Sequence, residues 1–127
     1  MKMLFVADLH YALKQFDWLA ANASNYDTVV IGGDLLDLAS PLDIEVQIVV
    51  VEKYLTRIRQ RARLIVSSGN HDGDSRNAAN ESVAQWILDS KAPQLFVDDD
   101  CVDVAGIVIT VCPWLRTTWP ASNCRIS

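Results

Sequence analysis

Apolar and polar residues alternate along the chain with two periods, one typical of strands and the other of helices. Short apolar runs at residues 3–7, 27–31 and 63–67 each end in polar residues, as buried strands do. Between these runs, apolar residues recur at spacings of three and four, which predicts amphipathic helices over residues 14–24 and 44–62. The expected buried face of the longer helix consists of Ile44, Ile48, Val51, Leu55, Ile58 and Ala62.

The pattern is weaker in the second half of the chain. Apolar spacing over residues 79–87 predicts a third helix, and residues 95–97 predict a short strand. Residues 101–104 and 106–112 flank a glycine and predict a hairpin. Residues 113–127 contain two prolines and no period, so we expect an irregular C-terminal tail.

The order strand, helix, strand, helix, strand predicts the fold class. It indicates an α/β domain with a partly parallel sheet and flanking helices. We expect this domain to cover residues 1–112, with the tail at 113–127 outside it.

Composition excludes several classes of protein. Half of the 127 residues are hydrophobic and 21% are charged, which is not the composition of a disordered chain. No apolar run approaches the ~20 residues that cross a bilayer, so we expect no membrane segment. The net charge of −5 argues against a general nucleic-acid binder. It suits a site that gathers carboxylates around cations.

The cysteines indicate the compartment. Cys101, Cys112 and Cys124 form no Cys-x-x-Cys motif, and no secretory signal precedes them. We therefore expect free thiols and a cytoplasmic protein.

Polar side chains follow the end of each of the three strands. Asp8 and His10 follow the first, Asp34 the second, and Asn70 and His71 the third. Ligands of open α/β sheets bind outside the carboxyl ends of the strands. Because neighbouring strands are only ~4.8 Å apart, these three loops can converge on one small group of ions.

The residue types indicate which ion such a site would hold. Carboxylate, imidazole and amide oxygen without cysteine favour Mn, Fe or Zn over a thiolate-bound structural zinc. A carboxylate between other ligands, such as Asp34, can bridge two metals, and a metal pair activates water and polarises a phosphoryl group.

Other interpretations of these residues remain open. Acidic residues at the ends of strands also occur in phosphoacceptor receiver domains. That interpretation, however, would leave Asn70 and His71 without a role. Asp72 and Asp74 can cap the third helix. The acidic run at residues 98–100 is most simply an exposed turn before the hairpin.

Three segments resemble the first signature blocks of the calcineurin-like metallophosphoesterases. They are Asp8-Leu9-His10, Gly33-Asp34-Leu35-Leu36-Asp37 and Gly69-Asn70-His71-Asp72. The resemblance implies the first half of a four-layer α/β/β/α sandwich. It also implies hydrolysis of a phosphate ester by a metal-bound hydroxide, with two divalent metal ions in the complete family site.

The resemblance also implies a role for each matching residue. Asp8 and His10 would bind the first metal, and Asp34 would bridge both metals. Asn70 would bind the second metal and the substrate phosphate. His71 would contact the phosphate and act as the catalytic acid that protonates the leaving alkoxide.

The chain departs from the family pattern after its third block. The family completes its site with a lone histidine and a Gly-His-x-His block, and this chain has no histidine after His71. We therefore expect weak binding at the first site, which keeps Asp8, His10 and Asp34, and poorer binding at the second, which keeps only Asp34 and Asn70. The family domain is also about twice this length.

Two hypotheses follow. In one, the chain is a phosphoesterase carrying the N-terminal half of the site, and a longer parent or a partner chain supplies the rest. In the other, it is a truncated, non-catalytic protein with weak metal binding. We also expect homodimerisation to cover an apolar hairpin left exposed at residues 102–111. The substrate is open among monoesters, diesters, cyclic nucleotides and nucleic acid, the last being unlikely.

Overall fold

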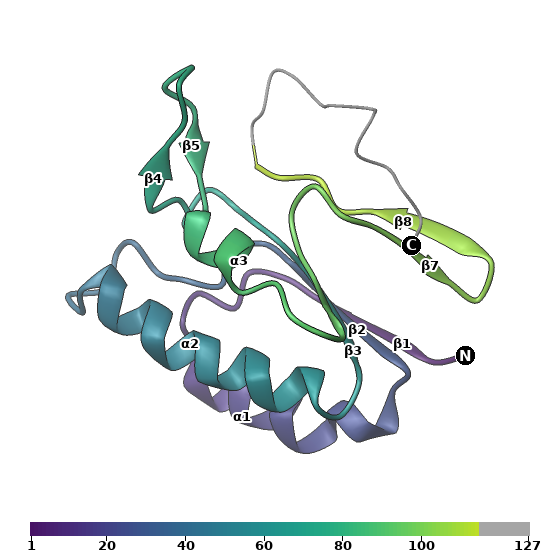
Figure 1. The fold of residues 1–127 in the computed structure, drawn as a ribbon. Helices are drawn as coiled ribbons and strands as arrows, with labels where there is room; N and C mark the ends of the chain where they lie inside the picture. The colour runs from purple at the N-terminus through teal and green to yellow at the C-terminus, as the bar shows by residue number, and fades with distance from the viewer. Residues whose placement is uncertain (115–127) are drawn as a thin grey trace.

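In the computed structural model, which describes residues 1–114, parallel strands form the centre of the molecule (Figure 1). They pair in the order β1-β2-β3-β6, so the chain crosses over between neighbours. The strands are β1 (Met3–Val6), β2 (Thr28–Gly32), β3 (Arg63–Ser67) and β6 (Leu95–Phe96). The predicted α/β class with a partly parallel sheet is confirmed.

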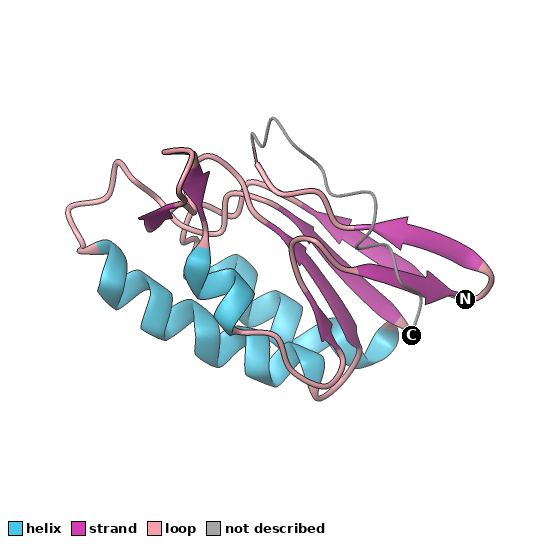
Figure 2. Ribbon diagram, turned by 45° about the horizontal axis from the view of Figure 1, so that its top comes forward, coloured by secondary structure: helices cyan, strands magenta, loops and turns pink. Residues whose placement is uncertain are grey.

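The helices cover one face of this sheet (Figure 2). The helical segments are α1 (Leu13–Asn22), the 3₁₀ turn η1 (Ala23–Asn25), α2 (Ile44–Arg59) and α3 (Gln85–Asp89). Both long helices were predicted, and α2 ends one turn earlier than its apolar spacing suggested. Ala62 nevertheless stays buried, because the chain turns directly into β3.

The main core lies between the helices and the sheet. Alternate strand residues Val29, Ile31, Leu64 and Val66 point into it. The helices contribute Phe16 and Leu19 from α1 and the predicted positions Val51, Leu55 and Ile58 from α2, all of them almost fully buried. Such alternation is what a strand with one face on a core requires.

A hairpin covers part of the opposite face. Strands β7 (Cys101–Val104) and β8 (Ile107–Thr110) pair antiparallel, as predicted. Val102, Val104 and Val111 pack there against Ile65 of β3.

The third helix was predicted too long. Strands β4 (Ser75–Arg76) and β5 (Ser82–Val83) form a small hairpin. Its second strand occupies part of the expected first half of that helix, and the helix observed there is α3. The Asn77 side-chain oxygen accepts hydrogen bonds from the N–H groups of Ala79 and Glu81. Such local side-chain bonds compete with helix formation.

The expectation of three free thiols is wrong for one cysteine. Cys101 is disulfide-bonded, whereas Cys112 is exposed and free. From residue 115 onward, the predicted irregular tail lies outside the described residues. None of the helices described within residues 1–114 is long and apolar enough to cross a bilayer.

Candidate metal centre

The loops after β1 and β2 are joined by backbone hydrogen bonds. Asp8 N–H donates to the Gly33 carbonyl at 3.1 Å, and His10 N–H donates to the Asp34 carbonyl at 2.9 Å. Tyr11 N–H continues the series with a bond of 2.8 Å to the carbonyl of Leu35. The two loops therefore extend the pairing of their strands beyond the sheet, which keeps Asp8, His10 and Asp34 together.

The backbone of these loops is strained. Asp8, His10, Tyr11 and Asp34 all have positive φ angles, of 56°, 45°, 57° and 55°. Residues other than glycine rarely adopt this left-handed region, and each costs on the order of 1–3 kcal/mol. Such strain persists only where the surroundings enforce it, and it is concentrated at functional sites.

Asp8, His10 and Asp34 form a group that fits a metal ion. One ligand atom from each lies within 4.8 Å of the other two. His10 Nε2 is 3.9 Å from Asp8 Oδ1, while His10 Nδ1 faces the Leu36 carbonyl at 3.4 Å. A proton on Nδ1 leaves the lone pair of Nε2 free, which is how histidine ligands are usually oriented. Two carboxylates and an imidazole suit a divalent cation of the Mn, Fe or Zn type.

The loop after β3 brings Asn70 and His71 next to the Asp34 carboxylate. His71 N–H donates to Asp34 Oδ1 at 3.0 Å. With its amide oriented so that the nitrogen faces Asp34, Asn70 donates to both Asp34 oxygens, at 3.0 and 3.1 Å. The rings of His10 and His71 meet edge to face, with centroids 4.6 Å apart. The fold thus brings together all five residues singled out in the sequence.

Gly69 makes this close approach possible. A Cβ atom at this position would lie 2.2 Å from Asp34 Oδ1 and 2.4 Å from Asp34 N. No real side chain tolerates such distances, so any other residue would displace Asp34. Gly33 has a φ of +88°, and a Cβ added there would lie 3.1 Å from the backbone of Gly69.

Asp72 holds two of the loops together, a role that the sequence analysis missed. Its side chain is fully buried and accepts hydrogen bonds from Leu36 N–H at 3.0 Å and Gly69 N–H at 2.8 Å. Burial raises the pKa of this carboxyl to about 6, although the two backbone hydrogen bonds oppose the rise and the charge of Asp34 adds to it.

Of the two aspartates expected to cap the third helix, only Asp74 binds its first turn. Asp74 Oδ1 accepts a hydrogen bond from Gln85 N–H at 2.7 Å. Asp72 directly follows His71 and lies well before the helix. This position in the sequence could have indicated that Asp72 supports the site rather than caps the helix.

Asp98 supports the third loop from the hairpin side. The sequence suggested an exposed turn at residues 98–100, but Asp98 is buried and accepts a hydrogen bond from Ser68 N–H at 2.9 Å. The prediction failed because polar composition alone does not tell a solvated carboxylate from one that satisfies buried N–H groups.

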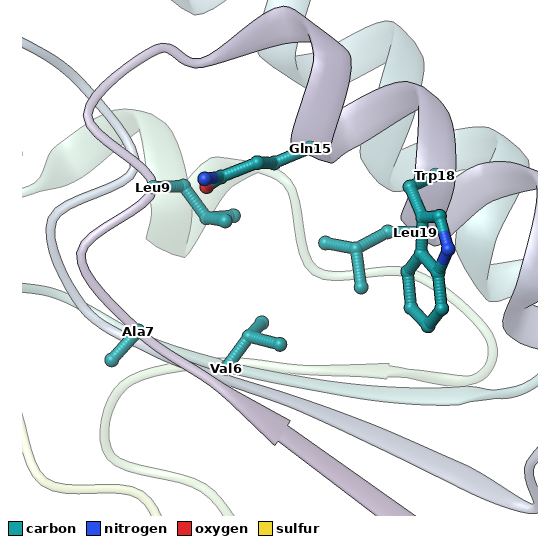
Figure 3. Close-up of a pocket in the computed structure, with 6 residues that line it drawn as sticks. All are labelled: Val6, Ala7, Leu9, Gln15, Trp18 and Leu19. Atoms are coloured by element: carbon teal, nitrogen blue, oxygen red, sulfur yellow. The ribbon is translucent and has the colours of Figure 1, made fainter.

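A cavity of about 300 Å³ lies beside this site, between the end of β1 and α1 (Figure 3). Its lining residues are Val6, Ala7, Leu9, Gln15, Trp18 and Leu19. Leu9 points into it, whereas its neighbours Asp8 and His10 belong to the metal group. The cavity is largely apolar and offers none of the ligand atoms described above.

Comparison with known proteins agrees with these features. The family model described as calcineurin-like phosphoesterase matches residues 1–113, which include every element and site residue described above. No curated protein matches the chain.

Proposed function

Because the chain belongs to the calcineurin-like phosphoesterase family, we propose that it hydrolyses a phosphate ester with the help of a divalent cation. The observation that carries this proposal is the group formed by Asp8, His10 and Asp34, whose ligand atoms come from two different loops. Strained backbone holds these residues in place, as expected for a built site rather than a chance acidic cluster.

Asp8, His10 and Asp34 would hold the cation, which we propose to be Mn, Fe or Zn. When bound, it supplies positive charge for the phosphoryl oxygens and a nucleophile at neutral pH. Asp8 is largely exposed, with a side-chain exposure of 70%, so this side of the group is open to a substrate.

Asn70 and His71 would act on the substrate. The Asn70 amide can turn its oxygen toward a cation near Asp34 or its nitrogen toward a phosphate oxygen. His71 accepts a hydrogen bond from Leu38 N–H at Nδ1, so the neutral ring carries its proton on Nε2. The neutral ring would donate this N–H to a phosphate oxygen, whereas protonation of the leaving alkoxide would require the imidazolium form of His71.

A second cation would be held poorly by these residues. The chain contains two histidines, and both already lie in this cluster. Of the candidate ligands, only Asp34 and Asn70 are available to a second cation. We therefore propose one cation held by Asp8, His10 and Asp34 and a weaker second site, which histidines from a longer parent or a partner chain would complete. The alternative is a non-catalytic protein that binds one cation.

Metal content and hydrolysis of bis(p-nitrophenyl) phosphate with added Mn test the proposal. We expect the wild-type chain to bind Mn and to turn over. Asp34→Asn should lower Mn affinity and turnover by more than about 100-fold, because it removes a charged ligand. Asp43→Asn is the matched control, because Asp43 is exposed and its side chain caps nothing.

The possible outcomes separate the two hypotheses. Mn binding without hydrolysis would favour the non-catalytic alternative. A chain that neither binds Mn nor turns over, or turnover that survives Asp34→Asn, would contradict the proposed function.

A further inference from the structure

The tautomer of His71 depends on one backbone N–H group. Leu38 N–H donates to His71 Nδ1 at 3.1 Å. A neutral imidazole has one donor and one acceptor nitrogen, so this bond keeps the ring proton on Nε2. The position of the Leu38 peptide therefore decides which ring nitrogen can donate to a substrate.

The side chain of Leu38 does little to hold that peptide in place. It is 56% exposed, in the segment between β2 and α2 that has no regular structure.

Gln47 of α2 supplies the missing restraint. Its side chain is 1% exposed and all its hydrogen-bonding atoms face the segment before the helix. Gln47 Oε1 accepts from Asp37 N–H at 2.9 Å, and Nε2 donates to the carbonyls of Asp37 and Leu42, both at 3.0 Å. Both N–H groups of the amide are thus used.

The Asp37 carbonyl and the Leu38 N–H belong to the same peptide group. That group is planar and trans, so the two point in opposite directions and move as one rigid unit. Gln47 Nε2 binds one end of this unit and His71 Nδ1 binds the other. Hydrogen bonding at the carbonyl also polarises the peptide and makes its N–H a better donor.

A glutamine at this position needs an explanation other than packing. Gln47 lies one turn before Val51 and two turns before Leu55 on the buried face of α2, where an apolar residue would fill the space. A buried polar side chain is costly unless it is fully hydrogen-bonded. Here its bonds go entirely to the segment that contacts His71.

We propose that Gln47 is a positioning residue for His71. Through the Asp37–Leu38 peptide, it keeps Leu38 N–H on Nδ1 and the ring proton on Nε2. Its importance for catalysis rests on the proposed function above, whereas its effect on the tautomer does not.

Ring ¹⁵N shifts measured by NMR test this inference directly. The protein is treated with EDTA and studied at pH 8, and His71 is assigned with His71→Gln. We expect wild-type His71 to show the Nε2–H tautomer alone. Gln47→Met keeps the size of the side chain and removes its hydrogen bonds, so it should give a mixture of tautomers. With Mn, it should lower kcat by about tenfold and change Mn affinity less than twofold.

Val51→Ala is the matched control. It opens space on the same face of the same helix and removes none of the hydrogen bonds between Gln47 and residues 37–42, so it should lower the melting temperature and leave the His71 tautomer unchanged. If Gln47→Met does not fold, Gln47→Glu keeps the bond from Asp37 N–H and loses both donated bonds. It should then give the tautomer mixture.

Each outcome bears on one hypothesis. Unchanged ring shifts in a folded Gln47 variant, a wild-type ring protonated at Nδ1, or the same mixture in Val51→Ala would overturn the inference. An inert wild-type protein with the expected shifts would contradict only the proposed hydrolysis.

Discussion

The polar rim and the hairpin face of this molecule are held together in different ways. By the polar rim we mean the loops at residues 7–12, 33–38 and 68–72, and by the hairpin face the sheet surface on the side of β7 and β8. The rim consists of strained backbone and buried polar groups, each with a defined partner. The hairpin face consists of a few packed valines beside exposed apolar side chains.

Exposure on the hairpin face increases toward β1. Phe5, Val30 and Ile65 lie side by side across three strands. Ile65 is 2% exposed under the hairpin, whereas Phe5 at the edge of the sheet is 67% exposed. The hairpin therefore covers the centre of this face and leaves the β1 edge open.

Because of this difference, we expect substitutions in the two regions to change different properties of the protein. In the rim, shifts of a few tenths of an ångström move ligand atoms, so substitutions should change cation binding. On the hairpin face only the buried apolar area matters, so substitutions should change stability or association instead.

The largest effect is expected at Gly69. Gly69→Ala places a methyl group where Asp34 now lies, so it should lower Mn affinity by about 100-fold and turnover at least as much. Gly32→Ala, at the end of β2 next to the rim, is the control, because its Cβ would meet only ordinary contacts of 3.6 Å. Titration calorimetry with Mn measures both. Equal affinities for the two variants would show that the rim is more tolerant than its geometry implies.

Asp72 should make stability depend on pH. Its pKa is about 6 in the fold, above the ordinary 3.8, so its protonated form is the one that the fold favours. This contribution is complete below about pH 4 and is lost as pH rises through about 6, a change of up to about 3 kcal/mol.

Urea unfolding of EDTA-treated protein between pH 4 and 7 measures that change. The free energy of unfolding of wild type relative to Asp72→Asn should fall over this range and then level off, because the amide does not titrate. A difference that is constant with pH would contradict the raised pKa of Asp72.

Packing under the hairpin should matter for stability alone. Val104 is 2% exposed, so Val104→Ala should lower the free energy of unfolding by roughly 1–2 kcal/mol through loss of buried surface. Val108→Ala, at a position 45% exposed, should change it by less than about 0.5 kcal/mol. Mn affinity should be the same in both variants. A change in Mn affinity for Val104→Ala would show that the two regions are coupled.

The smallest effect on the folded chain is expected at the β1 edge. Homodimerisation, predicted from the sequence, stays a prediction, and the exposed side chains of Phe5, Ile107 and Val108 are where we expect it to occur. Phe5→Ser should leave the melting temperature nearly unchanged and shift light scattering from dimer to monomer. Wild-type protein that is monomeric at high concentration would rule out this association.

Much of the candidate site could be predicted from the sequence alone, because its residues directly follow the apolar runs that form strands. Asp8, Asp34 and Asn70 each come shortly after such a run, and parallel strands bring their carboxyl ends to one edge. The long helices were predicted for a similar reason, since their periodic apolar faces extend over several turns.

The supporting residues could not be predicted in this way. Gln47 looks like one polar residue on a helix, and Asp72 looks like a helix cap. Their partners lie 10 residues away at Asp37 and 36 residues away at Leu36. The third helix failed because Asn77 forms local side-chain bonds that a count of apolar positions does not include.

The sequence by itself determined the order of β1, β2, β3 and the two long helices, the face that each buries, and the set of ligand types at the ends of these strands. These depend on periodicity and residue chemistry, both of which are local. Only the tertiary structure decided that Asp34 would touch both neighbouring loops, that Asp72 would be buried, and that Gln47 would reach the peptide next to His71. Burial and hydrogen bonding across loops depend on distances between residues far apart in the chain, which no local pattern records.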